Sequence, residues 1–191
     1  KELTRYRRPC LFEQAKDGLK NLPNDTRIGA APHSLRAVAP ESLAQTIALA
    51  AGGPVHTHLA EQVAEVAEVE AAWGQRPVEW LLDNVDVNAQ WCLIHCTQMQ
   101  PHETIKLAQT GAVAGLCPIT ESNLGDGIFD ADRWFEHGGR MGIGSDSNIR
   151  ISLSEELRTL DYSQRLRDHS RAALATPEIS TGRRLFEAAA K

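Results

Sequence analysis

The sequence lacks a long apolar run and a basic tract. No stretch approaches the ~18 apolar residues of a membrane-spanning helix, and no charged-then-apolar leader with a small-residue cleavage site is present. Twenty Lys and Arg residues face 25 Asp and Glu residues, for a net charge of −5. This balance argues against nucleic acid or an anionic membrane as the main partner. We therefore expect a cytoplasmic protein that acts on a small molecule.

Cysteine pairs and glycine-rich motifs are also missing. The four cysteines, Cys10, Cys92, Cys96 and Cys117, form no CxxC pair. Three of them lie in apolar, strand-like surroundings, which predicts buried free thiols rather than disulfides or a structural zinc site. No GxGxxG or GxxxxGK[ST] motif follows a predicted strand, so the sequence gives no support for a phosphate-binding loop.

What the sequence does contain is a regular alternation of patterns. Short apolar runs alternate with longer amphipathic stretches, as in βαβ units with a parallel sheet. The predicted strands are 27–31, 54–59, 91–95, 112–117 and 140–145. The predicted helices are 40–51, 62–73, 78–83, 101–110, 130–137 and 154–168, with a last one from residue 181.

A polar side chain follows each predicted strand, which favours a barrel over an open doubly wound sheet. These residues are His33, His58 with Glu61, His95, the segment 120–123, and Asp146. In a barrel such positions converge on one mouth, whereas an open sheet concentrates its ligands near one switch point. We predict an α/β fold, a TIM-type (β/α)₈ barrel.

The predicted barrel is incomplete. At about 31 residues per βα unit, 191 residues hold about six units. The chain begins with Lys1 and ends at Lys191 inside a helical pattern without a Gly or Asn stop. We expect a piece of a longer protein. An incomplete barrel leaves edge strands unpaired, which favours self-association, so a homodimer is one of the expected states.

The segment from His56 to Glu61 carries the richest chemistry. His56 and His58 are two residues apart, so on a strand they point to the same face, and Glu61 follows where the chain turns into a helix. Imidazole suits Zn²⁺, and a carboxylate beside a metal-bound water is a plausible proton carrier. Taken alone, paired core or surface histidines explain this motif equally well. His95 and Asp146, at the ends of later strands, favour a site, although Asp146 also fits a helix N-cap.

These residues resemble the deaminase branch of the amidohydrolase superfamily. The matching pieces are His58-Leu-Ala-Glu61, His95 and Ser145-Asp146. The segments 31–38 and 117–127 are similar to the formimidoylglutamate deiminase family in particular. The resemblance implies a distorted (β/α)₈ barrel with a small β-sandwich domain. Residues 1–191 would form a partial barrel of about strands 4 to 8, without the N-terminal strands and the sandwich.

The resemblance also implies a metal-dependent mechanism. His58 and Asp146 would bind one Zn²⁺, or another divalent ion such as Fe²⁺, together with two histidines of a strand that is absent here. His56 would be a neighbour rather than a ligand. Asp146 would take the proton of the attacking water, His95 would orient the nucleophile and stabilise charge, and Glu61 would pass a proton to the leaving nitrogen.

The implied reaction converts N-formimidoyl-L-glutamate to N-formyl-L-glutamate and ammonia, in histidine degradation. Arg36 would bind a substrate carboxylate through its planar guanidinium, and His33 would donate a hydrogen bond beside it. The segment 120–127, rich in Gly and Asn, is expected to be a loop in the site wall.

Two alternatives stay open. One is another amidohydrolase deaminase or chlorohydrolase that acts on a nitrogen heterocycle. Such sites favour aromatic stacking, and aromatic residues make up only 5% of this chain, which favours an aliphatic, charged substrate. The other is a fragment without activity of its own, because a catalytic zinc site has three protein ligands and this chain supplies His58 and Asp146.

Overall fold

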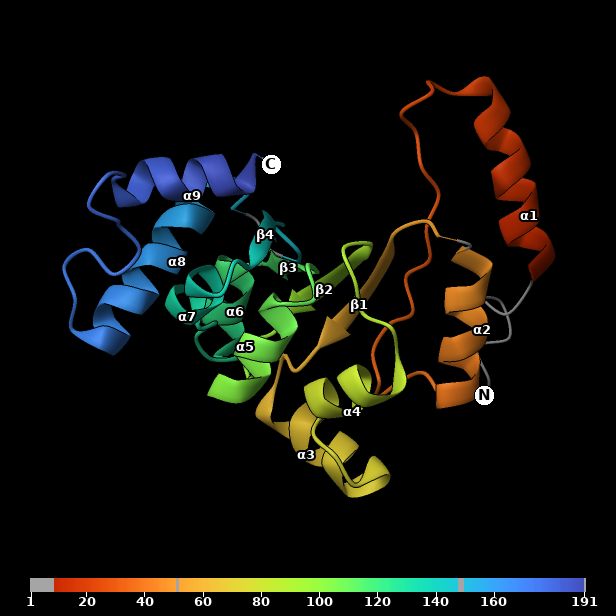
Figure 1. Ribbon diagram of the computed structural model, residues 1–191, viewed down its shortest axis with the longest axis horizontal. Coiled ribbons are helices and arrows are strands. Elements are labelled where there is room, and N and C mark those ends of the chain that lie inside the picture. Colours follow the sequence, from red (N-terminus) through yellow and green to blue (C-terminus); the bar gives the residue numbers. More distant parts are fainter. Residues whose placement is uncertain (1–8, 51, 148–149, 191) are drawn as a thin grey trace.

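The strands form one parallel sheet in chain order. The structure is a computed structural model that describes residues 9–50, 52–147 and 150–190 (Figure 1). Each strand pairs in parallel with the next, so their carboxyl ends meet at one edge. The order β1-β2-β3-β4 has no reversal within these residues, as in a barrel wall rather than a doubly wound sheet. The strands are β1 (Val55–Leu59), β2 (Trp91–His95), β3 (Val113–Leu116) and β4 (Arg140–Ile143).

Helices connect these strands and continue after them. Seven of them confirm predicted helices to within a few residues, although residue 51, the predicted end of the first, lies outside the described residues. The helices are α1 (Pro9–Gly18), the 3₁₀ turn η2 (Leu19–Asn21), α2 (Pro40–Ala50), α3 (Val63–Trp73), α4 (Pro77–Asn84), α5 (Pro101–Ala108), α6 (Pro118–Leu124), α7 (Ala131–Glu136), α8 (Leu153–Asp168) and α9 (Thr181–Ala189).

The prediction of a strand at 27–31 is wrong, because this segment forms no regular strand. This segment reaches the sheet through two isolated parallel bridges, Ala30 with Val55 and Ser34 with His58. Ala30 N–H donates to the Pro54 carbonyl, and the Ala30 carbonyl accepts from His56 N–H. The segment then bends, so a continuous ladder does not form. It nevertheless runs beside β1 and brings His33 next to it.

Two helices were not predicted. Helix α6 occupies Pro118–Leu124, so the expectation of a loop over 120–127 is wrong for its first half. The helix has Pro118 in its first turn and ends at Gly125, whose φ of 72° is left-handed. Both are sequence signals for helix ends, and they outweigh the Gly and Asn content. The other is helix α1, Pro9–Gly18, which continues directly into η2 with Gly18 in the right-handed helical region (φ −63°).

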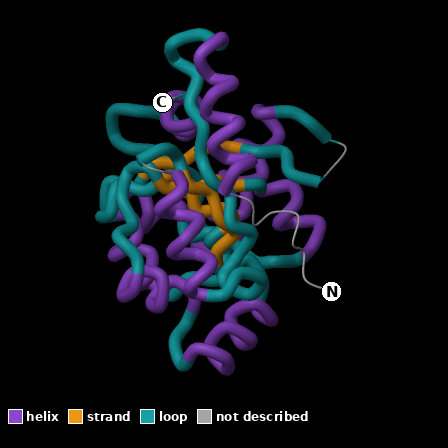
Figure 2. The backbone as a smooth tube through the Cα atoms, turned by 90° about the vertical axis from the view of Figure 1, so that its right-hand side faces the viewer, coloured by secondary structure: helices purple, strands orange, loops and turns teal. Residues whose placement is uncertain are grey.

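The two faces of the sheet differ in burial. Figure 2 shows the strands in the middle of the molecule with helices around them. Val55, Leu59 and Leu93 lie on the buried face, and each such side chain contributes about 1.5–3 kcal/mol to folding. On the other face of β1, His56 is exposed and His58 is half-buried. His58 therefore lies on the more exposed face of β1, near the carboxyl edge of the sheet.

The prediction of buried free thiols holds for Cys96 and Cys117, whereas Cys92 is only half-buried. Cys92, Cys96 and Cys117 are free thiols, two of them buried, while the side chain of Cys10 lies outside the described residues. Burial raises the pKa of the Cys117 thiol to about 12. Among the described helices, none is both long and apolar enough to cross a membrane.

Candidate active site

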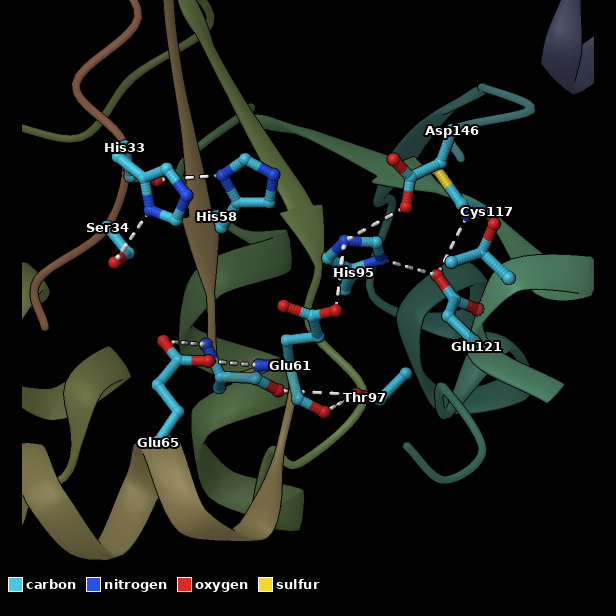
Figure 3. Close-up of polar contacts among 12 residues, drawn as sticks. His33, Ser34, His58, Glu61, Glu65, His95, Thr97, Cys117, Glu121 and Asp146 are labelled. Carbon is cyan, nitrogen blue, oxygen red and sulfur yellow. Dashed lines mark hydrogen bonds and ion pairs between the residues drawn. The ribbon is translucent and has the colours of Figure 1, made fainter. Parts of the chain in front are cut away.

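His58 stands near the end of β1 with its ring oriented by the neighbouring segment. Its Nδ1 lies 2.8 Å from the carbonyl oxygen of His33, and because a carbonyl can only accept, Nδ1 carries the proton. In the neutral ring this leaves Nε2 as the nitrogen with a lone pair. The rings of His33 and His58 stack with their centroids 4.7 Å apart (Figure 3).

His33 and Arg36 both lie in the segment beside β1. His33 Nδ1 contacts the hydroxyl of Ser34 at 3.1 Å. Burial first, and then the charges of His58 and Arg36, lower the pKa of His33. The Arg36 guanidinium lies 3.8 Å from Glu68 on α3, and both side chains are substantially exposed. Arg36 lies three residues after His33 in the chain, and its ionic contact in this structure is Glu68.

His95, at the end of β2, lies at the centre of the site and is only 1% exposed. Its ring centroid is 5.6 Å from that of His58. Its Nε2 is 3.6 Å from Oε1 of Glu61 and 3.9 Å from Oδ2 of Asp146. Its Nδ1 is 3.2 Å from Oε1 of Glu121. Burial lowers the pKa of His95, but the hydrogen bond to Glu121 and the surrounding carboxylates outweigh it, so the pKa is raised.

Glu61 follows β1 on a turn that a second glutamate holds in place. The backbone N–H groups of Ala60 and Glu61 donate to the two carboxylate oxygens of Glu65, at 3.1 and 2.7 Å. Thr97 donates its hydroxyl to the carbonyl of Glu61. Burial is the main cause that raises the pKa of the Glu61 carboxyl. A raised pKa suits a group that gains and loses a proton near neutral pH.

Asp146 follows β4 and faces the same space. Gly144 N–H donates to the Leu116 carbonyl, which ties the segment after β4 to β3. The side chain of Asp146 is 31% exposed, and His95 lies between it and His58 (Figure 3). His58, Glu61, His95 and Asp146, which are far apart in the chain, thus gather at one edge of the sheet.

Strained backbone occurs at each of these strand ends. Ala60, His95 and Asp146 adopt left-handed φ values of 48°, 72° and 47°. Such conformations cost non-glycine residues about 1–3 kcal/mol each and persist only where the surroundings hold them. At His95, the N–H of Cys96 donates back to the Ile94 carbonyl, as in the rare γ-turn with positive φ. The strain re-aims side chains at the carboxyl edge.

The donor groups present fit the divalent metal that the sequence predicted. His58 offers Nε2 because its Nδ1–H is bonded to a carbonyl, the usual arrangement of a metal-binding histidine. Asp146 offers a partly exposed carboxylate on the same edge. Imidazole and carboxylate are ligands of Zn²⁺ and of Fe²⁺.

Three residues of the site were given no individual role by the sequence analysis. Glu65 supports the turn at Glu61, and Glu121 and Cys117 lie beside His95. A ring nitrogen of His95, the Sγ of Cys117 and a carboxylate oxygen of Glu121 all lie within 4.8 Å of one another, and all three residues are buried. Glu65 could have been found, because a glutamate in the first turn of a helix often caps it. The segment 120–123 was expected at the barrel mouth, but nothing in the sequence singled out Glu121 or its contact with His95, which spans 26 residues.

Comparisons with known proteins agree with this geometry. The chain matches the amidohydrolase family over residues 7–178. It is 51% identical to the formimidoylglutamate deiminase of Pseudomonas aeruginosa over 85% of this chain and 36% of that protein. An amidohydrolase from Brucella melitensis superposes with a TM-score of 0.90 at 52% identity, over 95% of this chain and 40% of that one. A zinc-bound adenosine deaminase from Xanthomonas campestris, at 24% identity and a TM-score of 0.83 over 94% of this chain and 40% of that one, shares the fold.

These matches agree in extent and in architecture. The chain spans 36% of the Pseudomonas protein and 40% of the Brucella chain. Its parallel sheet is part of the barrel of these relatives, which confirms the predicted partial (β/α)₈ barrel. Because the family match extends over most of the residues and one relative is more than half identical, the chain belongs to the amidohydrolase family.

Proposed function

We propose that the protein containing this chain hydrolyses N-formimidoyl-L-glutamate to N-formyl-L-glutamate and ammonia, a step of histidine degradation. The observation that carries the proposal is the placement of His95, within 4 Å of both Glu61 and Asp146 and beside His58. The 51% identity to a formimidoylglutamate deiminase supports this choice of substrate.

His58 and Asp146 would hold the metal. His58 would use Nε2, and the hydrogen bond from its Nδ1 to the His33 carbonyl would keep the ring in that orientation. The resemblance assigns the remaining ligands to histidines outside this chain. When bound, a divalent cation such as Zn²⁺ lowers the pKa of its water from 15.7 toward ~7, which supplies a nucleophile at neutral pH.

The carboxylates would move the protons. Asp146 accepts the proton of the attacking water, and Glu61 passes a proton to the nitrogen that leaves as ammonia. His95 lies between them, and its raised pKa favours the imidazolium, in which both ring nitrogens carry protons. In that form Nε2 would donate a hydrogen bond and stabilise the negative charge that develops as the substrate carbon is attacked. The near-complete burial of His95 shields its ring from bulk solvent.

The segment beside β1 would bind the glutamate part of the substrate. The planar guanidinium of Arg36 can bind a carboxylate through two hydrogen bonds. In this structure it lies 3.8 Å from the carboxylate of Glu68. A pair at this distance between exposed side chains contributes little, so a substrate carboxylate can replace Glu68 at small cost. His33, stacked on His58, would bond the substrate beside Arg36.

The direct test is a substrate panel with the full-length, zinc-loaded protein. Ammonia release would be measured with formimidoylglutamate, guanine and adenosine at equal concentrations. We expect the highest kcat/KM for formimidoylglutamate. Faster release from either heterocycle would overturn the proposed substrate and favour a heterocycle deaminase.

A further inference from the structure

Glu121 contacts His95 on the side of the ring opposite Glu61 and Asp146. Its Oε1 lies 3.2 Å from His95 Nδ1, whereas Glu61 and Asp146 face Nε2 (Figure 3). Both Glu121 and His95 are buried, at 4% and 1% exposure. Water therefore does not compete for this hydrogen bond, which makes it strong and directional.

Glu121 is itself held rigidly at the start of α6. The same Oε1 accepts the backbone N–H of Cys117 at 2.8 Å, and the Glu121 N–H donates to the Cys117 carbonyl at 3.0 Å. Cys117 directly follows β3, so the carboxylate is fixed to the sheet that carries His95. An acceptor held in this way can determine where a neighbouring ring points.

The contact also determines which nitrogen of His95 carries a proton. The Glu121 Oε1 that contacts Nδ1 of His95 also accepts the backbone N–H of Cys117. Because an ionised carboxylate oxygen can only accept, Nδ1 of His95 is the donor in this contact. Nε2 is then the nitrogen that exchanges hydrogen bonds with the reacting groups. The left-handed backbone of His95 makes this support necessary, because a strained residue keeps its geometry only when its neighbours enforce it.

We propose that Glu121 is a positioning residue, which binds Nδ1–H of His95 and thereby aims Nε2 at the space between Glu61 and Asp146. The predicted effect on kcat rests on the proposed deamination, whereas the predicted orientation of the His95 ring does not depend on it. Glu121 contacts neither His58 nor the substrate-binding segment in this structure, so its effect falls on the chemical step rather than on metal or substrate binding.

The test compares two variants in the full-length zinc-loaded protein. Glu121→Met fills a similar volume without an acceptor, and we expect kcat to fall about 10- to 100-fold, as for other groups that orient a site residue. KM and zinc content should stay within about threefold of the wild-type values, because the variant loses only the interaction of His95 with the transition state. Glu121→Gln keeps a carbonyl oxygen for Nδ1–H, so kcat should remain within about threefold of wild type.

A double-mutant cycle separates positioning from general destabilisation. In a His95→Ala background, Glu121→Met should cause little further loss of kcat, because the group that it orients is gone. Glu103→Gln is the matched control: Glu103 is a buried carboxylate bonded to Arg76, away from the site residues, so its loss should lower the unfolding midpoint and leave kcat unchanged.

Crystal structures of both variants give a readout that does not depend on activity. We expect the His95 ring to turn in Glu121→Met and to stay in place in Glu121→Gln. An unmoved ring or an unchanged kcat in a folded Glu121→Met protein would overturn the proposal. If Glu121→Met does not fold, Glu121→Gln decides, and a turned ring or a loss as large as tenfold in kcat would overturn it. An inactive wild type refutes the proposed function alone, since the ring positions still test Glu121.

Discussion

Glu61 is the residue on which the proposed proton transfer depends most directly. Its carboxylate lies 3.6 Å from His95 Nε2, and burial raises its pKa. Glu65 and Thr97 fix the backbone on either side of it. A group fixed in this way can deliver a proton without first reorganising.

Replacement of Glu61 by Gln removes the proton carrier and keeps the shape of the side chain. We expect turnover of formimidoylglutamate by the full-length protein to fall about 10²- to 10⁴-fold, the usual effect of losing a general acid or base. Zinc content should stay unchanged, because Glu61 is not a proposed ligand. Glu79→Gln is the matched control, since Glu79 also contacts a histidine, His102, on the surface. Turnover of Glu61→Gln within about threefold of wild type would rule out the shuttle role.

Arg36 tests the substrate assignment at the same scale. Arg36→Met removes the guanidinium, so we expect kcat/KM for formimidoylglutamate to fall about 10- to 100-fold through the loss of a charge-assisted hydrogen bond. Metal content should change little. Arg183→Met serves as the control because Arg183 pairs with Glu187 on the surface of α9. Unchanged kinetics of Arg36→Met would remove Arg36 from the site.

At the scale of elements, the segment beside β1 and the helix after β3 support the site from two sides. The segment that contains Ala30 and His33 gives His58 its carbonyl acceptor. Helix α6 gives His95 its carboxylate acceptor. Neither element belongs to the sheet, yet each sets the orientation of one histidine that the sheet carries.

The close approach of this segment to β1 requires a glycine at position 29. A Cβ there would lie 2.1 Å from the carbonyl oxygen of Pro54, so the backbone must shift. We expect Gly29→Ala to destabilise the full-length protein by about 1–3 kcal/mol, as overpacking does. It should also lower kcat, because the His33 carbonyl that orients His58 moves. Chemical denaturation and ammonia release measure the two effects.

Gly182→Ala is the control for that substitution. Gly182 lies in α9, and a Cβ there meets nothing within 4 Å. The change should leave stability the same or raise it slightly, since alanine favours the helix. Equal stability of the Gly29 and Gly182 variants would show that the segment tolerates displacement.

At the scale of the whole molecule, the described sheet is an open wall. Strand β4 pairs with β3 on one side, and the outer side of β1 carries only the bridges to Ala30 and Ser34. In the Brucella relative, the corresponding chain is more than twice as long as the part that superposes. The proposed metal shell would likewise be completed by residues outside this chain.

The 191-residue chain by itself should therefore hold zinc weakly. His58 and Asp146 supply two ligands at the proposed site, while catalytic zinc sites have three. We expect substoichiometric zinc by metal analysis after dialysis, and full occupancy in the full-length protein treated in the same way. Stoichiometric zinc in the short chain that is lost on His58→Ala would contradict the prediction that this site is incomplete.

Much of the site could be predicted because its signals are local. His58, Glu61, His95 and Asp146 were recognisable as polar side chains near the carboxyl ends of apolar strands, and parallel pairing then brings them to one edge. The strands 91–95 and 140–145 were placed to within two residues for the same reason. The prediction of a strand at 27–31 was wrong because an apolar, β-like sequence does not show whether the segment pairs continuously with the adjacent strand.

The sequence by itself determined the α/β alternation, the order of the strands and the residue types at their carboxyl ends, since these follow from short-range periodicity. Only the tertiary structure decided that Glu121 binds His95, that Glu65 holds the turn at Glu61, and that Ala60, His95 and Asp146 adopt left-handed backbone. Each of these depends on contacts between separate elements or on strain that packing enforces. The backbone preferences of single residues disfavour such strain, so no local sequence pattern could predict it.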